Sequence, residues 1–280
     1  MVEQLTLNQR VAGSTPASST CFNMENLIQL STIQNAVIFF ILGVIVAFIN
    51  GLAGGASSLS LPIMILLGLP PTVANGTNRF GMLVGIFSSV FHMRRYGYLR
   101  MDIAKALLPP TLLGGAAGSL IAVVIDDSHF QMLLAFVMVA VAIMSSMGTD
   151  PFGKAPEKPP ERPGVKAFLG FTAVGFYGGF LQVGMGFVQI FSLRKYSGLD
   201  LKQVNAIKSF LSLWFLFMSS LFFFVAGKVI LELAITMALG GIFGGFLGSK
   251  FQHKHDQIWI KRAIQLASIG LAGKLIYDLF

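Results

Sequence analysis

Two basic residues occupy similar positions in two similar stretches of an otherwise strongly apolar sequence. Arg79 ends the polar cluster of "VANGTNRFGMLVG" (73–85), and Lys208 stands within "VNAIKSFLSLWFLF" (204–217). An ionisable residue inside a membrane costs about 2.5 to 3.5 kcal/mol on insertion scales and is by default a functional candidate. No acidic residue lies between 26 and 101 to neutralise Arg79. We therefore predict that a mobile anion is the partner of these two cations.

Two structural roles for the cations stay open beside the functional one. Arg79 and Lys208 lie near predicted helix starts, so their side chains could reach the membrane interface by snorkelling. Arg79 could instead bond to exposed carbonyls of a broken helix. The sequence alone does not decide between these roles and anion binding.

Glycine breaks and neutral hydrogen-bond donors accompany the two cations. In "INGLAGGASSLSLP" (49–62) and "YGGFLQVGMGFVQ" (177–189), glycines interrupt an apolar run and a short second segment follows. The N-terminus of a helix carries unpaired N–H groups and a partial positive charge, so it attracts anions. The predicted substrate-binding residues are Gly54, Gly55, Ser57, Ser58, Asn75, Thr77, Asn78, Arg79, Gln182, Gly184, Gly186, Asn205 and Lys208.

The composition predicts that membrane helices position these residues. The 280-residue chain is 54% hydrophobic and 11% charged, with a mean hydropathy of +0.74, whereas soluble domains carry about 25% charged residues. The net charge of +8 does not indicate nucleic-acid binding, because the basic residues separate apolar segments instead of covering one face. One cysteine, and four histidines without ligand spacing beyond His253 and His255 in a short basic loop, predict neither a metal site nor a cofactor. No nucleophile–base pair lies within an apolar segment, so we do not expect an enzyme.

The second half of the chain aligns with the first half without a gap. The alignment superposes Gly54 on Gly184 and Asn75 on Asn205, together with further glycines. We therefore expect an all-α polytopic membrane protein built from two inverted repeats of five apolar segments each, with roughly 8 to 10 transmembrane helices. The second segment of each repeat should be short or re-entrant. Close helix packing is expected at the small-residue faces formed by Gly114, Gly115, Gly118, Gly241, Gly244, Gly245 and Gly248.

The charges predict the orientation and the domain boundaries. The basic excess changes sides between the two copies, as the positive-inside rule requires of inverted repeats. The expected organisation is a first repeat at 33–147, a Pro-rich cytoplasmic linker at 148–165 and a second repeat at 166–278. Both termini would lie outside a plasma (bacterial inner) membrane. Residues 1–24 are expected to be a non-structural extension, either a disordered tail or the product of a start placed upstream of Met24.

The glycine-rich "GLAGGASSLSLP", the "ANGTNR" that follows it, and the second-half "GFLQVGMGF" and "VNAIK" resemble the sulfite exporter TauE/SafE family. The likeness extends from about 34 to 278. By position, the family's first glycine motif falls on Gly51, Gly54 and Gly55, its proline on Pro62, and its Thr-containing motif on 74–78. The second half departs from the family pattern at Ser192, where a proline is usual, and at Ile207, where a threonine is usual.

The resemblance implies transport of anions, often sulfur-containing oxyanions or organosulfonates. Together with the two cations, it predicts a transporter that moves such an anion outward, of the sulfite, sulfoacetate or thiosulfate type, between the two repeats. The alternative is a membrane-embedded structural or assembly subunit without transport activity. The expected partners are the lipid bilayer and the small anionic substrate, without nucleic acid, and a homo-oligomer is compatible with the sequence.

Overall fold

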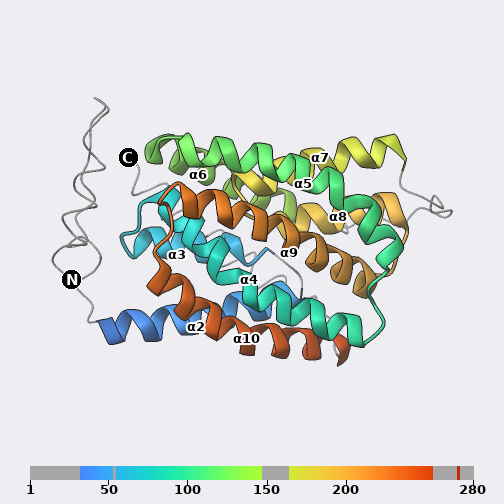
Figure 1. Cartoon of the computed structure of the whole chain (residues 1–280), viewed down its shortest axis with the longest axis horizontal. Helices are drawn as coiled ribbons and strands as arrows, with labels where there is room; N and C mark the ends of the chain where they lie inside the picture. Colours follow the sequence, from blue (N-terminus) through green and yellow to red (C-terminus); the bar gives the residue numbers. More distant parts are fainter. Residues whose placement is uncertain (1–31, 53–54, 147–163, 255–269, 272–280) are drawn as a thin grey trace.

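The computed structural model describes residues 32–52, 55–146, 164–254 and 270–271, and these are arranged entirely as helices and their connections (Figure 1). The predicted all-α class is confirmed for this part of the chain. In chain order the helices are α2 (Thr32–Leu52), α3 (Ser57–Leu66), α4 (Pro71–Arg95), α5 (Met101–Val124), α6 (Asp127–Ser146), α7 (Val165–Phe180), α8 (Met185–Ser197), α9 (Leu201–Val225) and α10 (Leu231–Lys254).

Several helices have the length and composition needed to cross a membrane. Within the described ranges, four candidate spans meet both criteria, and they lie in α2, α5, α9 and α10. α6 and α7 contribute shorter apolar stretches. Large apolar side chains such as Val124, Phe136 and Phe217 point outward and are 79%, 72% and 52% exposed. A lipid environment accounts for this surface, since a soluble protein rarely exposes so much apolar area. The chain is a multi-pass membrane protein.

Glycines bring two pairs of helices into close contact, as the small-residue faces predict. A Cβ added at Gly244 of α10 would lie 2.1 Å from the carbonyl oxygen of Val44 in α2. A Cβ added at Gly114 of α5 would lie 1.9 Å from the carbonyl oxygen of Thr172 in α7. Backbone therefore meets backbone in both pairs, which is how membrane helices gain contact without a hydrophobic driving force between them.

The second segment of each half is a short helix, as predicted. α3 has 10 residues and α8 has 13. Gly184 precedes α8 with φ +62°, and Gly55 precedes α3 with φ +84°, a backbone region that favours glycine. At Gly55 the ring of Phe187 also occupies the place of a side chain, because it lies 2.4 Å from an added Cβ. Both breaks therefore depend on glycine.

The long helices of the two halves share a common spacing. The offset in residue number from α4 to α9 is the same at both ends of the helices, and α5 and α10 start with that offset too. α4 and α9 run antiparallel, since Thr77 near the start of α4 accepts a hydrogen bond from the backbone N–H of Ile230, just beyond the end of α9. α10 runs parallel to α4, because Gly81 lies against Met237 and Ser88 bonds to the carbonyl of Ile242.

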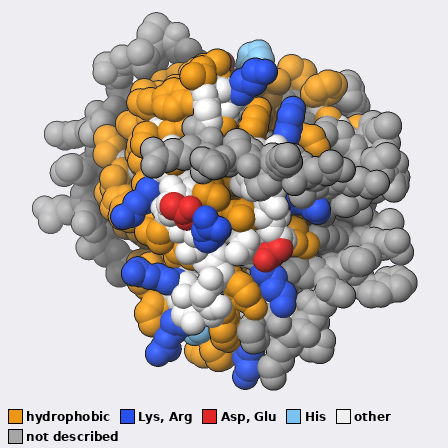
Figure 2. All heavy atoms as spheres, turned by 90° about the vertical axis from the view of Figure 1, so that its right-hand side faces the viewer, with side chains coloured by type: hydrophobic (Ala, Val, Ile, Leu, Met, Phe, Trp, Pro, Cys, Tyr) orange, Lys and Arg blue, Asp and Glu red, His pale blue; other side chains and the backbone are white. Residues whose placement is uncertain are grey.

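Basic side chains gather at one end of the molecule. Figure 2 looks onto that end and shows many Lys and Arg side chains and few acidic ones. α4 ends there with Arg94 and Arg95, and α8 ends there with Arg194 and Lys195. Lys202, at the start of α9, lies 5.7 Å from the ring of Tyr98 in the α4–α5 connection. We call this surface the basic end.

Candidate functional site

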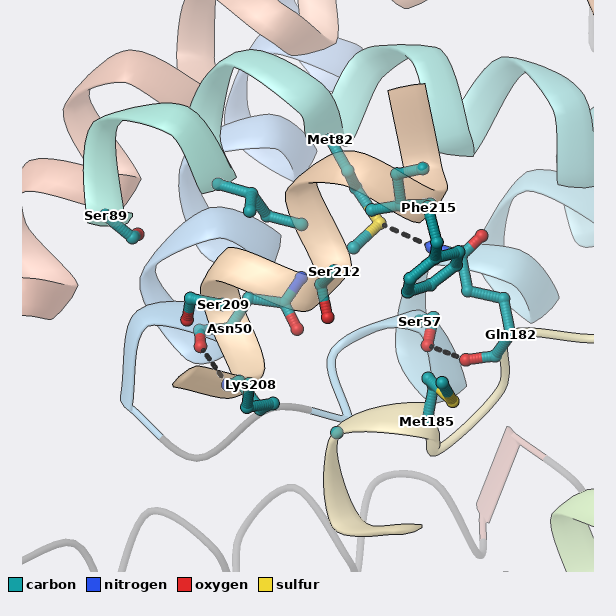
Figure 3. Close-up of a pocket in the computed structure, with 13 residues that line it drawn as sticks. Asn50, Ser57, Met82, Ser89, Gln182, Met185, Lys208, Ser209, Ser212 and Phe215 are labelled. Carbon is teal, nitrogen blue, oxygen red and sulfur yellow. Dashed lines mark hydrogen bonds between the residues drawn. The ribbon is translucent and has the colours of Figure 1, made fainter. Parts of the chain in front are cut away.

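A small cavity lies where the two halves meet (Figure 3). Its volume of about 30 Å³ suffices for roughly two waters. α4 and α9 supply most of its wall, and the end of α2, the starts of α3 and α8 and the break before α8 supply the rest. The lining residues are Asn50, Ser57, Met82, Ile86, Ser89, Gln182, Met185, Gly186, Lys208, Ser209, Ser212, Phe215 and Leu216.

Lys208 brings a cation to this cavity. Its side chain is only 3% exposed, and Nζ donates a hydrogen bond of 2.8 Å to the carbonyl oxygen of Asn50 near the C-terminus of α2. A cation is favourable there because the last carbonyls of a helix carry partial negative charge. Ser209 and Ser212 follow on α9 and line the same cavity. The lining therefore combines one buried ammonium group with hydroxyls, and none of the described lining residues is acidic.

The two glycine breaks touch each other beside the cavity. The Oγ of Ser57, the first residue of α3, donates to the carbonyl oxygen of Gln182 at 2.7 Å. Gln182 lies just before α8 with φ +65°, a conformation that non-glycine residues rarely adopt, and such strain is often found at functional sites. Its Nε2 lies 3.5 Å from the sulfur of Met82 in α4. The two breaks are therefore in direct contact.

Some buried amide atoms around the cavity have no hydrogen-bond partner among the described residues. These atoms are Nδ2 of Asn50, Oε1 of Gln182 and Nε2 of Gln189. Asn50 and Gln182 line the cavity, and Gln189 is linked to it because its Oε1 accepts a hydrogen bond of 2.8 Å from the lining residue Ser212. Buried polar groups are nearly always paired, so each of these atoms is available to a water or a ligand. Asn50 and Gln189 offer N–H donors, which suits an anion.

The lining also includes apolar side chains. They are Met82 and Ile86 from α4, Phe215 and Leu216 from α9, and Met185 from α8. A molecule held in this cavity would therefore meet hydrocarbon and sulfur as well as polar groups.

Arg79 lies outside the cavity and is buried completely. Its guanidinium donates to the carbonyl oxygens of Gly178 at 3.0 Å and Phe180 at 3.1 Å, the last turn of α7. It also donates to the Oδ1 of Asn75 at 3.1 Å and to the Oγ of Ser219 at 2.8 Å. These contacts correspond to the bonding with carbonyls of a broken helix that the sequence left open, and complete burial does not fit snorkelling to the interface.

The third helix of each half holds the end of the other half's first helix. In α4, Asn75 accompanies Arg79 and donates to the carbonyl of Phe180 at 3.2 Å. In α9, Asn205 accompanies Lys208 and donates to the carbonyl of Gly51 at 3.0 Å. Two cations and two asparagines therefore bond to the C-terminal ends of α7 and α2.

The other described residues of the predicted set do not line the cavity. The hydroxyl of Ser58 bonds to the carbonyl of Gly55 at 2.6 Å, and Thr77 accepts from Ile230 at 3.0 Å. Asn78 is buried with neither side-chain polar atom bonded among the described residues. Gly184 caps α8, and Gly54 lies outside the described residues.

The cavity contains only some of the residues that the sequence predicts for the site. The predicted residues that line it are Ser57, Gln182, Gly186 and Lys208. The polar lining residues that the sequence reasoning missed are Asn50, Ser89, Ser209 and Ser212. Ser212 follows Lys208 by four residues, so helical spacing from the cation could have identified it, whereas Ser209, one residue after the cation, is not marked by such spacing.

The chain is similar to a known family of membrane proteins. The sequence model of the family described as "Sulfite exporter TauE/SafE" matches residues 39–275. A probable membrane transporter protein of Haemophilus influenzae is 25% identical over 241 residues, which cover 86% of this chain and 94% of that protein. The probable membrane transporter protein ORF9 of Sinorhizobium sp is 26% identical, covering 85% and 91% respectively. The probable membrane transporter protein YfcA of Escherichia coli K12 is 23% identical, covering 91% and 94%. No solved structure matches significantly.

Proposed function

Because this chain belongs to the sulfite exporter TauE/SafE family of membrane transporters, we propose that it carries a small anion through the cavity beside Lys208. The substrate is a sulfur-containing oxyanion or organosulfonate, of the sulfite, sulfoacetate or thiosulfate type, and it moves outward. The observation that carries this proposal is the buried ammonium group among hydroxyl and amide groups, without an acidic residue in the described lining.

The electrostatics of the cavity favour an anion over a cation or a neutral molecule. An isolated charge is costly to bury, and an opposite charge offsets part of that cost. An anionic oxygen is a stronger hydrogen-bond partner for the ammonium group of Lys208 than a main-chain carbonyl such as that of Asn50. Nδ2 of Asn50 and the hydroxyl of Ser209 can donate to the remaining oxygens of the anion, whereas the hydroxyl of Ser212 already donates to Gln189.

We infer that the two halves are inverted repeats of five segments, with the site at their interface. The matching bounds of α4 and α9 and of α5 and α10, and the antiparallel course of α4 and α9, support this interpretation. Secondary transporters commonly place their site at broken helices between such repeats. The basic end would then be cytoplasmic by the positive-inside rule, with both termini outside and the linker inside.

The membrane potential can drive export of an anion without a coupled proton. Each elementary charge that moves outward across a potential negative inside gains about 2.3 kcal/mol per 100 mV. That gain corresponds to roughly fifty-fold accumulation at 25 °C. We propose electrogenic export on this basis, with Lys208 partly compensating the charge of the bound substrate.

Thermal stabilisation of the purified protein and uptake into proteoliposomes together test the proposal. Sulfite, thiosulfate and sulfoacetate should each be compared for thermal stabilisation of the purified protein and for uptake into proteoliposomes, since a ligand of the folded state raises its stability. Lys208→Gln should lose the stabilisation and the uptake. Lys202→Gln, which removes the same charge six residues earlier on α9 at the basic end, should keep both.

The rival function gives the opposite result. A structural or assembly subunit would show neither stabilisation nor flux with any of these anions in the unmodified protein. Equal behaviour of Lys208→Gln and Lys202→Gln in a protein that does transport would place the site elsewhere in the molecule.

A further inference from the structure

Arg79 stands directly beyond the cavity on the side away from the basic end. Along α4, which ends at the basic end, Arg79 comes one turn before the lining residue Met82. Along α9, which starts at the basic end, its partner Ser219 comes one turn after the lining residue Leu216. The contact between Arg79 and Ser219 therefore lies one turn beyond the cavity lining on both helices, toward the end opposite the basic end.

The contacts of Arg79 tie three helices together at this level. The guanidinium of Arg79, on α4, donates hydrogen bonds to Asn75 on the same helix, to the last carbonyls of α7 and to Ser219 on α9. Ser119 of α5 adds a fourth helix, because its hydroxyl donates to Ser219 at 2.7 Å. The ring of Phe223, one turn beyond Ser219, lies 4.9 Å from the guanidinium carbon. We call Arg79, Asn75, Ser119 and Ser219 the Arg79 layer.

Every hydrogen-bond partner of Arg79 in the described part of the chain is neutral. They are two main-chain carbonyls, one amide oxygen and one hydroxyl. Hydrogen bonds in which both groups are charged are stronger and shorter than those to neutral acceptors. An anionic oxygen is therefore a better partner for this guanidinium than the carbonyls of α7. If the guanidinium were already paired with a carboxylate of the protein, a mobile anion would have no such advantage.

We propose that the Arg79 layer is the gate that closes the cavity toward the end opposite the basic end, and that the transported anion opens it. The anion binds first at Lys208 and then competes for the guanidinium, which releases the end of α7. Arg79 is thus a positioning residue in the closed state and meets the anion only as the gate opens. This inference rests on the proposed anion transport.

The test separates binding in the cavity from passage through the gate, with sulfite as the probe. Arg79→Gln keeps hydrogen-bonding atoms but removes the charge. It should retain sulfite stabilisation with a midpoint concentration within about threefold of the unmodified protein, while the maximal efflux rate from proteoliposomes falls about tenfold or more at unchanged KM. Lys208→Gln should lose the stabilisation itself.

A second pair of variants tests the gate without touching the charge. Ser219→Ala removes one bond that holds the gate closed, so the maximal rate should rise by about threefold or more, because a hydrogen bond to a charged group is among the stronger ones. Ser220→Ala is the matched control, since this neighbouring hydroxyl is buried and makes no hydrogen bond within the described part of the chain. This pair decides the question if Arg79→Gln does not fold.

Three results would overturn the gate. They are full transport by Arg79→Gln, loss of sulfite stabilisation in Arg79→Gln to the extent seen in Lys208→Gln, and equal rates for Ser219→Ala and Ser220→Ala. Failure of the unmodified protein to bind or move any of the tested anions would instead refute the proposed function, and the gate with it.

Discussion

The contact between α2 and α10 allows a stability prediction that does not depend on function. Replacing Gly244 by Ala places a Cβ 2.1 Å from the carbonyl oxygen of Val44, whereas ordinary contact begins at 3.4 Å. The two helix backbones must therefore move apart to restore ordinary contact. Neither group can rotate away, because both belong to helical backbone. The α2–α10 contact must loosen.

The magnitude follows from two opposing effects. Overpacking of this kind costs about 1 to 3 kcal/mol, and the severity of the overlap favours the upper end. Alanine regains about 1 kcal/mol of helix propensity relative to glycine. The net loss for Gly244→Ala should be about 2 kcal/mol in the free energy of unfolding, or roughly thirtyfold in the folded-to-unfolded ratio.

Gly241→Ala is the matched control, because it makes the same chemical change less than one turn away on α10. Its Cβ would lie 3.2 Å from the backbone nitrogen of Gly85, so the neighbouring helix needs to give by only a few tenths of an ångström. The gain in propensity should then make this variant as stable as the unmodified protein or more stable. Unfolding in mixed micelles by titration with a denaturing detergent measures both variants. Equal stability of the two would refute the packing argument.

Three further predictions address topology, energetics and a buried backbone donor. In a Cys21→Ser background, a cysteine at Gly164 should label only from the cytoplasm and one at Ser128 only from outside; labelling of both from one side would contradict the inverted plan. A potassium potential set with valinomycin, without a pH gradient, should change anion flux according to its sign and size, whereas flux that follows only a pH gradient would exclude electrogenic export. Thr77→Val should lower the unfolding free energy by about 1 to 3 kcal/mol, measured by the same detergent titration, because the N–H of Ile230 loses its acceptor; an unchanged value would show that water replaces the hydroxyl.

Local sequence signals were sufficient for the elements of this fold. Apolar length predicts membrane helices because the bilayer requires about 20 apolar residues per crossing. Glycine predicts the breaks before α3 and α8, because few other residues tolerate the backbone geometry found at Gly55 and Gly184. The constant offset between the motifs of the two halves reappears in the bounds of α4 and α9. These features depend on nearest neighbours along the chain or on the membrane as a solvent.

The roles of the two cations were decided only by the tertiary structure. Arg79 and Lys208 stand in similar local contexts, yet Arg79 bonds to the end of α7, while Lys208 lines the cavity. The difference arises from contacts between residues far apart in the sequence, such as Arg79 with Ser219 and Lys208 with Asn50. A sequence shows that a buried cation needs partners, because an unsatisfied charge is costly. Only the packing of α4 and α9 against the broken helices determines which carbonyls satisfy it, and so which cation lines the cavity.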